Sequence, residues 1–148
     1  MPEPAPPPPR PGAAAPFRHL HPSLFMTEPV ASLAEFRAFR ERMNDIILGA
    51  GNLTLNRFFA LDGRAYESGA LGVKTKELLG LVASLVLRCD DCITYHVVRC
   101  KEEGVTREEF LEVFSIGLVV GGSIVIPHLR RAMARLEELE GSGGTNKR

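Results

Sequence analysis

The stretch TKELLGLVASLVLR, residues 75–88, is the most apolar part of the chain and the part that decides its fold. Its leucines and valines leave almost no polar face on a helix, and they do not alternate with polar residues as in a half-exposed strand. This stretch therefore predicts a helix that is buried nearly all round. Such a helix must lie in the middle of a larger group of helices.

The segments that precede this helix also show helical periodicity. Ser32 and Glu35 form the pattern of a capping box, which predicts the start of a first helix. That helix should end at Gly49 or Gly51, and its apolar stripe is expected to face a core. Thr54 is predicted to cap a second helix. Thr75 is predicted to start the third helix, which is the apolar one.

Three more helices are predicted after residue 88, and no alternating β-branched run bounded by turn residues appears anywhere. The fourth helix is expected to start at Asp90 or Asp91 and to end at Gly104. The fifth should start at a capping box of Thr106 and Glu109, and Gly121 and Gly122 interrupt it. Pro127 is expected in the first turn of the last helix. The fold class is therefore all-α, a bundle of about six helices.

The prolines divide the chain into domains. Ten of the eleven prolines fall within the first 29 residues, and such a segment cannot form regular backbone hydrogen bonds. We therefore predict a flexible proline-rich segment over residues 1–31, an all-α domain over 32–140 and a flexible tail over 141–148. Because a domain of roughly 110 residues is small for a fully apolar inner helix, we also expect an oligomer.

Charge and hydropathy exclude several classes of partner. Eighteen basic and eighteen acidic residues give no net charge, so we expect no nucleic-acid partner. The longest apolar stretch, residues 116–126, is too short to cross a bilayer, so we expect no membrane span. The amino terminus does not resemble a secretory signal, which predicts a cytoplasmic location with reduced thiols.

Chemistry is indicated by the motif C-x-x-C-x-x-x-H, formed by Cys89, Cys92 and His96 at a predicted helix start. Because His96 lies one turn after Cys92, its imidazole can reach that thiol directly or through a water molecule. A helix amino terminus favours a thiolate, and a pair with this spacing can close into a disulfide. Asp90 and Asp91 act in the opposite direction, because nearby carboxylates raise the pKa of a thiol.

Zinc binding by Cys89, Cys92, His96 and Cys100 is the main alternative from the residues alone. On one helix, however, Cys92 and Cys100 are about 12 Å apart along the axis, too far to share one ion. We therefore predict no metal and interpret Cys100 as a packing residue. Tyr95 could line a pocket, and His128, in the opening turn of the last helix, is interpreted as a residue that satisfies local backbone groups rather than as part of the site.

With these residues in place, the segment over residues 73–136 resembles the carboxymuconolactone decarboxylase family, in its alkylhydroperoxidase D-like branch. The pattern is a glutamate, eleven residues, and then the cysteine–histidine motif, which Glu77, Cys89, Cys92 and His96 match. The resemblance implies an all-α trimer or hexamer. It also implies that the cysteines reduce hydroperoxides while Glu77 and His96 relay protons.

The chain departs from this branch at Asp91, where the best-known members have a second histidine. The true decarboxylases of the family generally lack the cysteine pair, so its presence argues against lactone decarboxylation. Spacing alone does not bring Glu77 to His96, because a simple antiparallel hairpin would leave them at different heights.

Our hypothesis is a thiol-dependent peroxidase in which Cys92 attacks a hydroperoxide and Cys89 closes the disulfide. A dithiol protein or small thiol must then reduce the pair, since no motif suggests a flavin, a nicotinamide or another cofactor. The alternatives are a disulfide oxidoreductase or redox sensor without peroxidase turnover, a decarboxylase-like lyase, and a non-catalytic helical oligomer with inert or zinc-bound cysteines.

Overall fold

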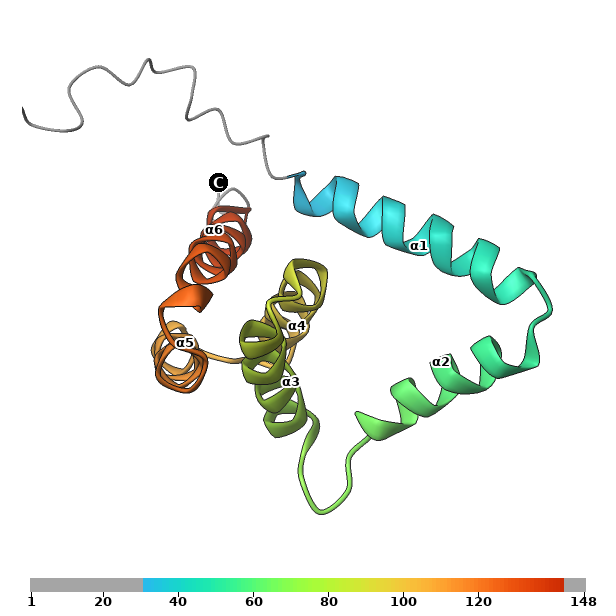
Figure 1. Cartoon of the computed structure of the whole chain (residues 1–148), viewed down its shortest axis with the longest axis horizontal. Coiled ribbons are helices and arrows are strands. Elements are labelled where there is room, and N and C mark those ends of the chain that lie inside the picture. Colours follow the sequence, from blue (N-terminus) through green and yellow to red (C-terminus); the bar gives the residue numbers. More distant parts are fainter. Residues whose placement is uncertain (1–30, 143–148) are drawn as a thin grey trace, which may run out of the picture. The chain divides into compact units, whose positions relative to one another are not determined.

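The computed structural model describes residues 31–142, which form six α-helices, one short 3-10 helix and no strand (Figure 1). The all-α prediction is confirmed over this range. The elements are α1 (Leu33–Gly49), α2 (Leu53–Ala65), α3 (Val73–Leu87), α4 (Asp90–Glu102), α5 (Arg107–Gly121), η2 (Ser123–Val125) and α6 (Ile126–Ser142).

The predicted terminal segments mostly lie outside the described residues. This holds for residues 1–30 of the proline-rich segment and for residues 143–148 of the tail. Gly141 and Ser142, which we assigned to the tail, belong to α6 instead. No helix within residues 31–142 is long and apolar enough to span a bilayer.

Side-chain caps fix where most of the helices begin. Both predicted capping boxes are present, Ser32 with Glu35 at α1 and Thr106 with Glu109 at α5. The cap predicted at Thr54 is wrong, because Asn52 takes that place: its Oδ1 accepts the amide hydrogens of Thr54 and Leu55 at 3.0 and 3.1 Å. An asparagine two residues earlier offers the stronger cap.

The third helix starts at Val73 rather than Thr75, after Gly72, which makes no side-chain cap. As predicted, Gly104 follows the end of α4, with φ of 74°, and the amide of Val105 donates to the carbonyl of Cys100 at 2.9 Å. Pro127 lies in the first turn of α6, also as predicted.

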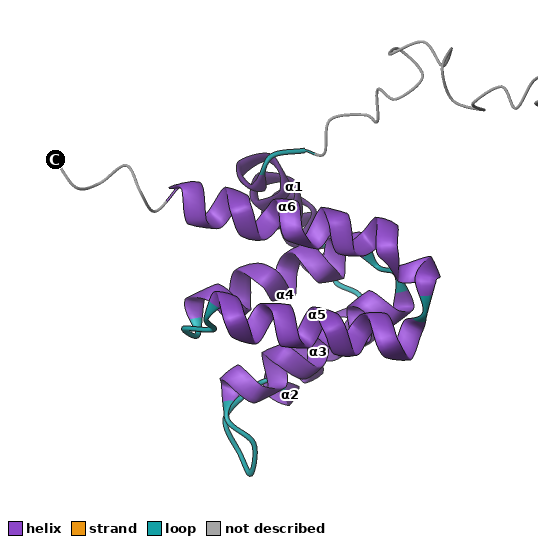
Figure 2. Ribbon diagram, turned by 90° about the vertical axis from the view of Figure 1, so that its left-hand side faces the viewer, coloured by secondary structure: helices purple, strands orange, loops and turns teal. Residues whose placement is uncertain are grey.

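The hydrophobic core lies among α3, α4, α5 and α6. Helix α3 packs against both α4 and α5, and α4 packs against α6, so these helices lie side by side (Figure 2). The buried apolar residues that they and their connections supply are Leu81, Leu85, Ile93, Val97, Cys100, Val105, Phe110, Val113, Phe114, Val125, Ala132 and Leu136.

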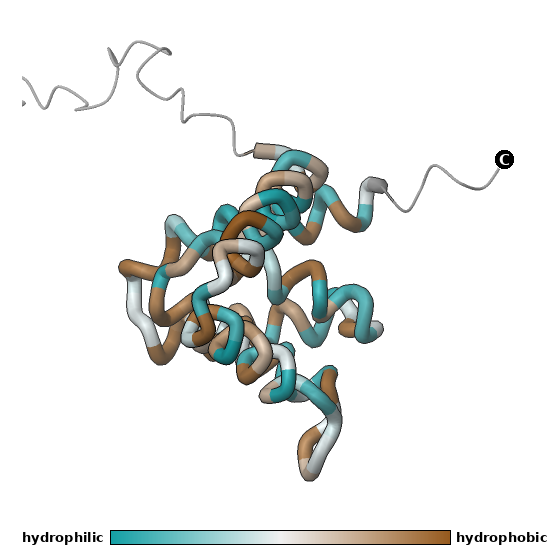
Figure 3. The backbone as a smooth tube through the Cα atoms, turned by 90° about the vertical axis from the view of Figure 1, so that its right-hand side faces the viewer, coloured by the Kyte–Doolittle hydropathy of each residue, from teal (hydrophilic) through white to brown (hydrophobic). Residues whose placement is uncertain are grey.

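Two burial predictions are wrong for the single chain. The apolar stripe of α1 does not face this core: Phe39 and Ile46 are 56% and 59% exposed, and Leu33 is the buried residue of α1. Helix α3 is buried on one face only, and Leu79 and Leu87 on its other face are exposed. Hydrophobic residues occur in every part of the described chain and are not confined to the helices of the core (Figure 3).

Candidate functional site

The cysteine pair is positioned by a sharp turn between α3 and α4. Arg88 ends α3 in the left-handed region, with φ of 61°, and the amide of Cys89 donates back to the carbonyl of Ser84 at 3.1 Å. The predicted cap at Asp90 or Asp91 is wrong, since both lie inside the first turn of α4. Cys89 is the cap, and its Sγ accepts the amide hydrogen of Cys92 at 3.3 Å.

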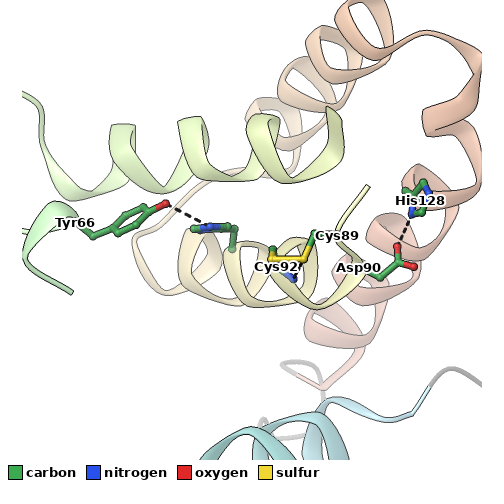
Figure 4. The surroundings of a disulfide bond; sticks show 6 residues. Tyr66, Cys89, Asp90, Cys92 and His128 are labelled. Carbon is green, nitrogen blue, oxygen red and sulfur yellow. Dashed lines mark hydrogen bonds and ion pairs between the residues drawn. A yellow bond between two sulfur atoms is a disulfide. The ribbon is translucent and has the colours of Figure 1, made fainter. Parts of the chain in front are cut away.

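Cys89 and Cys92 form a disulfide at the start of α4 (Figure 4). Their Cα atoms are 5.2 Å apart, which is within the range that a disulfide requires. Cys92 is exposed and Cys89 is half-buried. The spacing therefore places both sulfur atoms at the amino terminus of a helix, as predicted, and leaves Cys92 the more accessible of the two.

Glu77 and His96 meet in the interior of the same chain. Glu77 Oε2 lies 2.8 Å from His96 Nδ1, and the two side chains are only 2% and 9% exposed. Because an ionised carboxylate only accepts hydrogen bonds, Nδ1 is the donor. The contact, which spacing alone did not predict, is therefore direct and within one chain.

Tyr66, at the end of α2, lies against the other ring nitrogen of His96. Its hydroxyl is 3.5 Å from Nε2, and the two rings have centroids 5.4 Å apart (Figure 4). With Nδ1 carrying the hydrogen of a neutral ring, Nε2 is the acceptor and the hydroxyl donates toward it. Burial, and then the charge of Glu77, raise the pKa of Tyr66. Sequence reasoning missed this residue, because Tyr66 lies 30 positions from His96 and no motif joins them.

Gly80 makes room for these side chains. A Cβ atom at this position would lie 2.5 Å from Cε1 of His96 and 2.7 Å from the Tyr66 hydroxyl. Since real Cβ atoms essentially never approach so closely, any larger residue here would displace the imidazole or the phenol. Gly80 lies three residues after Glu77 and so shares a helix face with it. This spacing is the signal by which the sequence could have identified Gly80 as part of the site.

Arg99 is a further member of the group and contacts Glu77. Its Nε donates to Oε1 of Glu77 at 3.4 Å, so the carboxylate has a separate partner on each oxygen. The guanidinium also donates to Glu102 at 2.5 Å and to Glu103 at 3.3 Å. Sequence reasoning missed Arg99 as well, although it lies one turn after His96 on the same helix.

A cavity of about 320 Å³ brings the thiol and the imidazole to one space. Cys92 and His96 line it, as do Tyr66 and Tyr95, and α1 closes it with side chains that include Phe36, Phe39, Arg40 and Met43. The guanidinium of Arg40 lies 4.1 Å from the centre of the Tyr95 ring. Tyr95 thus lines a pocket, as sequence reasoning suggested.

His128 lies on the other side of the cysteine motif. Its Nδ1 is 2.7 Å from Oδ1 of Asp90, and Arg131 donates to the other oxygen of Asp90 at 2.7 Å (Figure 4). His128 does not line the cavity that holds Cys92. Its contact ties α6 to the first turn of α4.

Cys100 is fully buried in the core and is not bonded to another cysteine. Burial, and next the charge of Glu77, raise the pKa of its thiol to about 12. The thiol therefore stays protonated at neutral pH, which agrees with a packing role. Within residues 31–142, no group of three or more histidine, cysteine or acidic side chains is arranged to hold a metal ion.

Comparison with known proteins places this arrangement in a family. The model of the carboxymuconolactone decarboxylase family matches residues 52–135, which include α2 to α5 and the whole cysteine–histidine motif. The chain belongs to the carboxymuconolactone decarboxylase family. Protein 4 of the cox locus of Paracoccus denitrificans is 30% identical over 93 residues, which cover 63% of this chain and 84% of that protein.

Solved structures of the carboxymuconolactone decarboxylase family share the fold. A crystal structure of a Thermotoga maritima member, for which a role in antioxidative response has been suggested, is 56% identical with a TM-score of 0.70 and covers 76% of this chain and 98% of that one. The apo form of a Legionella pneumophila member is 28% identical with a TM-score of 0.53, and the match covers 71% of this chain and 87% of that one.

Proposed function

We propose that this protein is a thiol-dependent peroxidase that reduces hydroperoxides through Cys89 and Cys92. The observation that carries the proposal is the cavity lined by both the exposed Cys92 and His96, whose imidazole is bonded to the buried Glu77. A base held by a carboxylate, next to a nucleophile, is the arrangement that activates weakly acidic thiols.

Cys92 is the residue proposed to attack. It lines the cavity with His96, whereas Cys89 does not line it and caps α4. The Cys92 thiolate attacks one peroxide oxygen, the O–O bond breaks, and the alcohol leaves with the proton that the thiol gave up. The sulfenic acid on Cys92 then condenses with the thiol of Cys89, which releases water and forms the disulfide.

His96 is proposed to hold the proton of the Cys92 thiol until the alcohol leaves with it. Its Nδ1 faces Glu77 and its Nε2 faces Tyr66, so transfer to and from the Cys92 sulfur passes through a water molecule or the Tyr66 hydroxyl in the cavity. Asp91, which also lines the cavity, stands where the family branch has a second histidine. The relay proposed for this chain therefore uses one histidine.

A dithiol protein or a small thiol is proposed to return the disulfide to the dithiol by exchange. This requirement suits a reducing compartment such as the cytoplasm. Excess dithiol and an organic hydroperoxide should therefore give steady consumption of the peroxide, measured by a ferric–xylenol orange assay. Reduction of the disulfide without peroxide turnover would reject the peroxidase proposal in favour of a disulfide oxidoreductase or redox sensor.

We also propose a homo-oligomer, a trimer or a hexamer, as the working form. Large apolar side chains are exposed on α3, α5 and the turn that follows: Leu79, Leu87, Leu111, Ile116, Val119, Val120 and Ile124. Apolar surface of this kind on a soluble chain is usually covered by a partner.

Sedimentation velocity should give a mass of three or six times 16.2 kDa for the wild type. The charged substitution Val119→Glu, at a side chain that is 84% exposed, should reduce the assembly because it places an unpaired carboxylate in the interface. A monomeric wild type at micromolar concentration would contradict this proposal.

A further inference from the structure

Glu77 is a buried carboxylate with two different positively polarised partners. It is 1% exposed, with His96 Nδ1 2.8 Å from one oxygen and Arg99 Nε 3.4 Å from the other. A buried carboxylate is stable only when a cation or several hydrogen-bond donors compensate it. Two groups can therefore supply the positive charge, namely the guanidinium and a protonated imidazole.

Which of the two supplies the charge decides whether His96 can act as a base. Arginine is permanently charged in proteins, whereas histidine changes its charge near neutral pH. With Arg99 in place, Glu77 is compensated and a second positive charge on His96 is repelled by the first. Without Arg99, the imidazolium becomes the only cation in contact with Glu77, and an imidazolium has no lone pair with which to accept a proton.

From this we infer that Arg99 is a positioning residue that keeps His96 unprotonated and thus available as the base of the thiol cycle. The inference rests on the proposed function for its catalytic consequence, but the protonation state of His96 can be measured on its own. Arg99 does not touch the cavity that holds Cys92, so its effect passes through Glu77 and His96.

The surroundings of Arg99 hold its guanidinium in place. The hydrogen bond to Glu102 raises the pKa of Arg99, and Glu103 binds the other terminal nitrogen. The Glu102 side chain is 49% exposed and that of Glu103 is 32% exposed, so water screens them, whereas the Glu77 side chain is 2% exposed. Of these three carboxylates, Glu77 is therefore the one that water screens least from the charge of Arg99.

The other titratable groups around the pair do not replace Arg99. Two carboxylates line the cavity beside His96, Asp62 of α2 and Asp91 of α4. Two phenol hydroxyls do so as well, those of Tyr66 and Tyr95. Cys100 stays protonated, and Lys74 bonds to the carbonyl of Gly104 and to Glu109 rather than to Glu77. The two aspartates favour an imidazolium. Arg40 of α1 is a second cation in the cavity, and its guanidinium lies over the Tyr95 ring. Among residues 31–142, Arg99 is the permanent cation that contacts the Glu77–His96 pair itself and opposes an imidazolium there.

The experiment compares Arg99→Gln with Arg99→Lys, which restores the charge. Arg107→Gln is the matched control, because Arg107 binds two carboxylates on α6 and does not contact Glu77 or His96. Two quantities are measured on each protein: the acid side of the pH profile of kcat/KM for a hydroperoxide, and the NMR titration of labelled His96, assigned by its loss in His96→Asn.

We expect the pH of half-protonation of His96, and the acid side of the pH profile, to move up by about one unit in Arg99→Gln. At pH 7, kcat/KM should fall severalfold and recover at higher pH. Arg99→Lys should stay near the wild type, and Arg107→Gln should match it. An unchanged His96 titration in Arg99→Gln would overturn the inference. If no variant turns over peroxide, the proposed function fails while the NMR titration still decides the role of Arg99.

Discussion

Cys92→Ser is expected to reduce hydroperoxide consumption to the rate seen without protein. A serine hydroxyl is a far weaker nucleophile at neutral pH than a thiol, and no other described cysteine faces the cavity. Cys89→Ser should also lose steady turnover, but it should still react once. That single reaction leaves a sulfenic acid on Cys92, which dimedone traps and mass spectrometry detects.

Cys100→Ala is the matched control for these two substitutions. The Cys100 thiol is fully buried, with a pKa raised to about 12, so its removal should leave the turnover rate unchanged. If Cys92→Ser formed a sulfenic acid on Cys89 and Cys89→Ser did not react at all, the order of the two cysteines would be the reverse of the one proposed.

Gly80→Ala is expected to lower both the stability and the activity of the protein. Alanine in a helix interior normally stabilises by about 1 kcal/mol relative to glycine. At Gly80 the new Cβ would meet the buried His96 ring at 2.5 Å and the Tyr66 hydroxyl at 2.7 Å. We expect a net destabilisation of about 1–3 kcal/mol, together with at least a tenfold loss of kcat/KM because the imidazole is displaced.

Gly63→Ala in α2 provides the control for Gly80→Ala. A Cβ at Gly63 would meet nothing within 4 Å, so this substitution should raise the melting temperature and leave turnover unchanged. Thermal denaturation followed by circular dichroism, together with the peroxide assay, measures both effects. A melting temperature for Gly80→Ala that rises as it does for Gly63→Ala would show that the site is not crowded as described.

Local signals predicted most of the fold. The capping boxes of Ser32 and Thr106, and Gly104 after α4, lie where the pattern placed them, since caps depend on a few neighbouring residues. The burial of α1 could not be predicted in this way. Its apolar stripe indicates that some surface covers Phe39 and Ile46, but the pattern does not say whether that surface belongs to the same chain.

The candidate site could be predicted in part. Cys89, Cys92 and His96 stand close together in one segment, and helical geometry alone places them on one face, over two turns. Tyr66, Gly80 and Arg99 were missed because their roles depend on how α2, α3 and α4 cross, which no local pattern records. The contact of Glu77 with His96 came from the family pattern and not from spacing.

The central claim is that a hydroperoxide closes the bond between Cys89 and Cys92. Its most direct test adds one equivalent of cumene hydroperoxide to the reduced protein, quenches with an alkylating agent at short times, and locates the unmodified cysteines by peptide mass spectrometry. We expect Cys89 and Cys92 to lose their thiols together, at a rate that falls in Glu77→Gln, while Cys100 remains a thiol. Free thiols on both Cys89 and Cys92 after the peroxide has been added would contradict it.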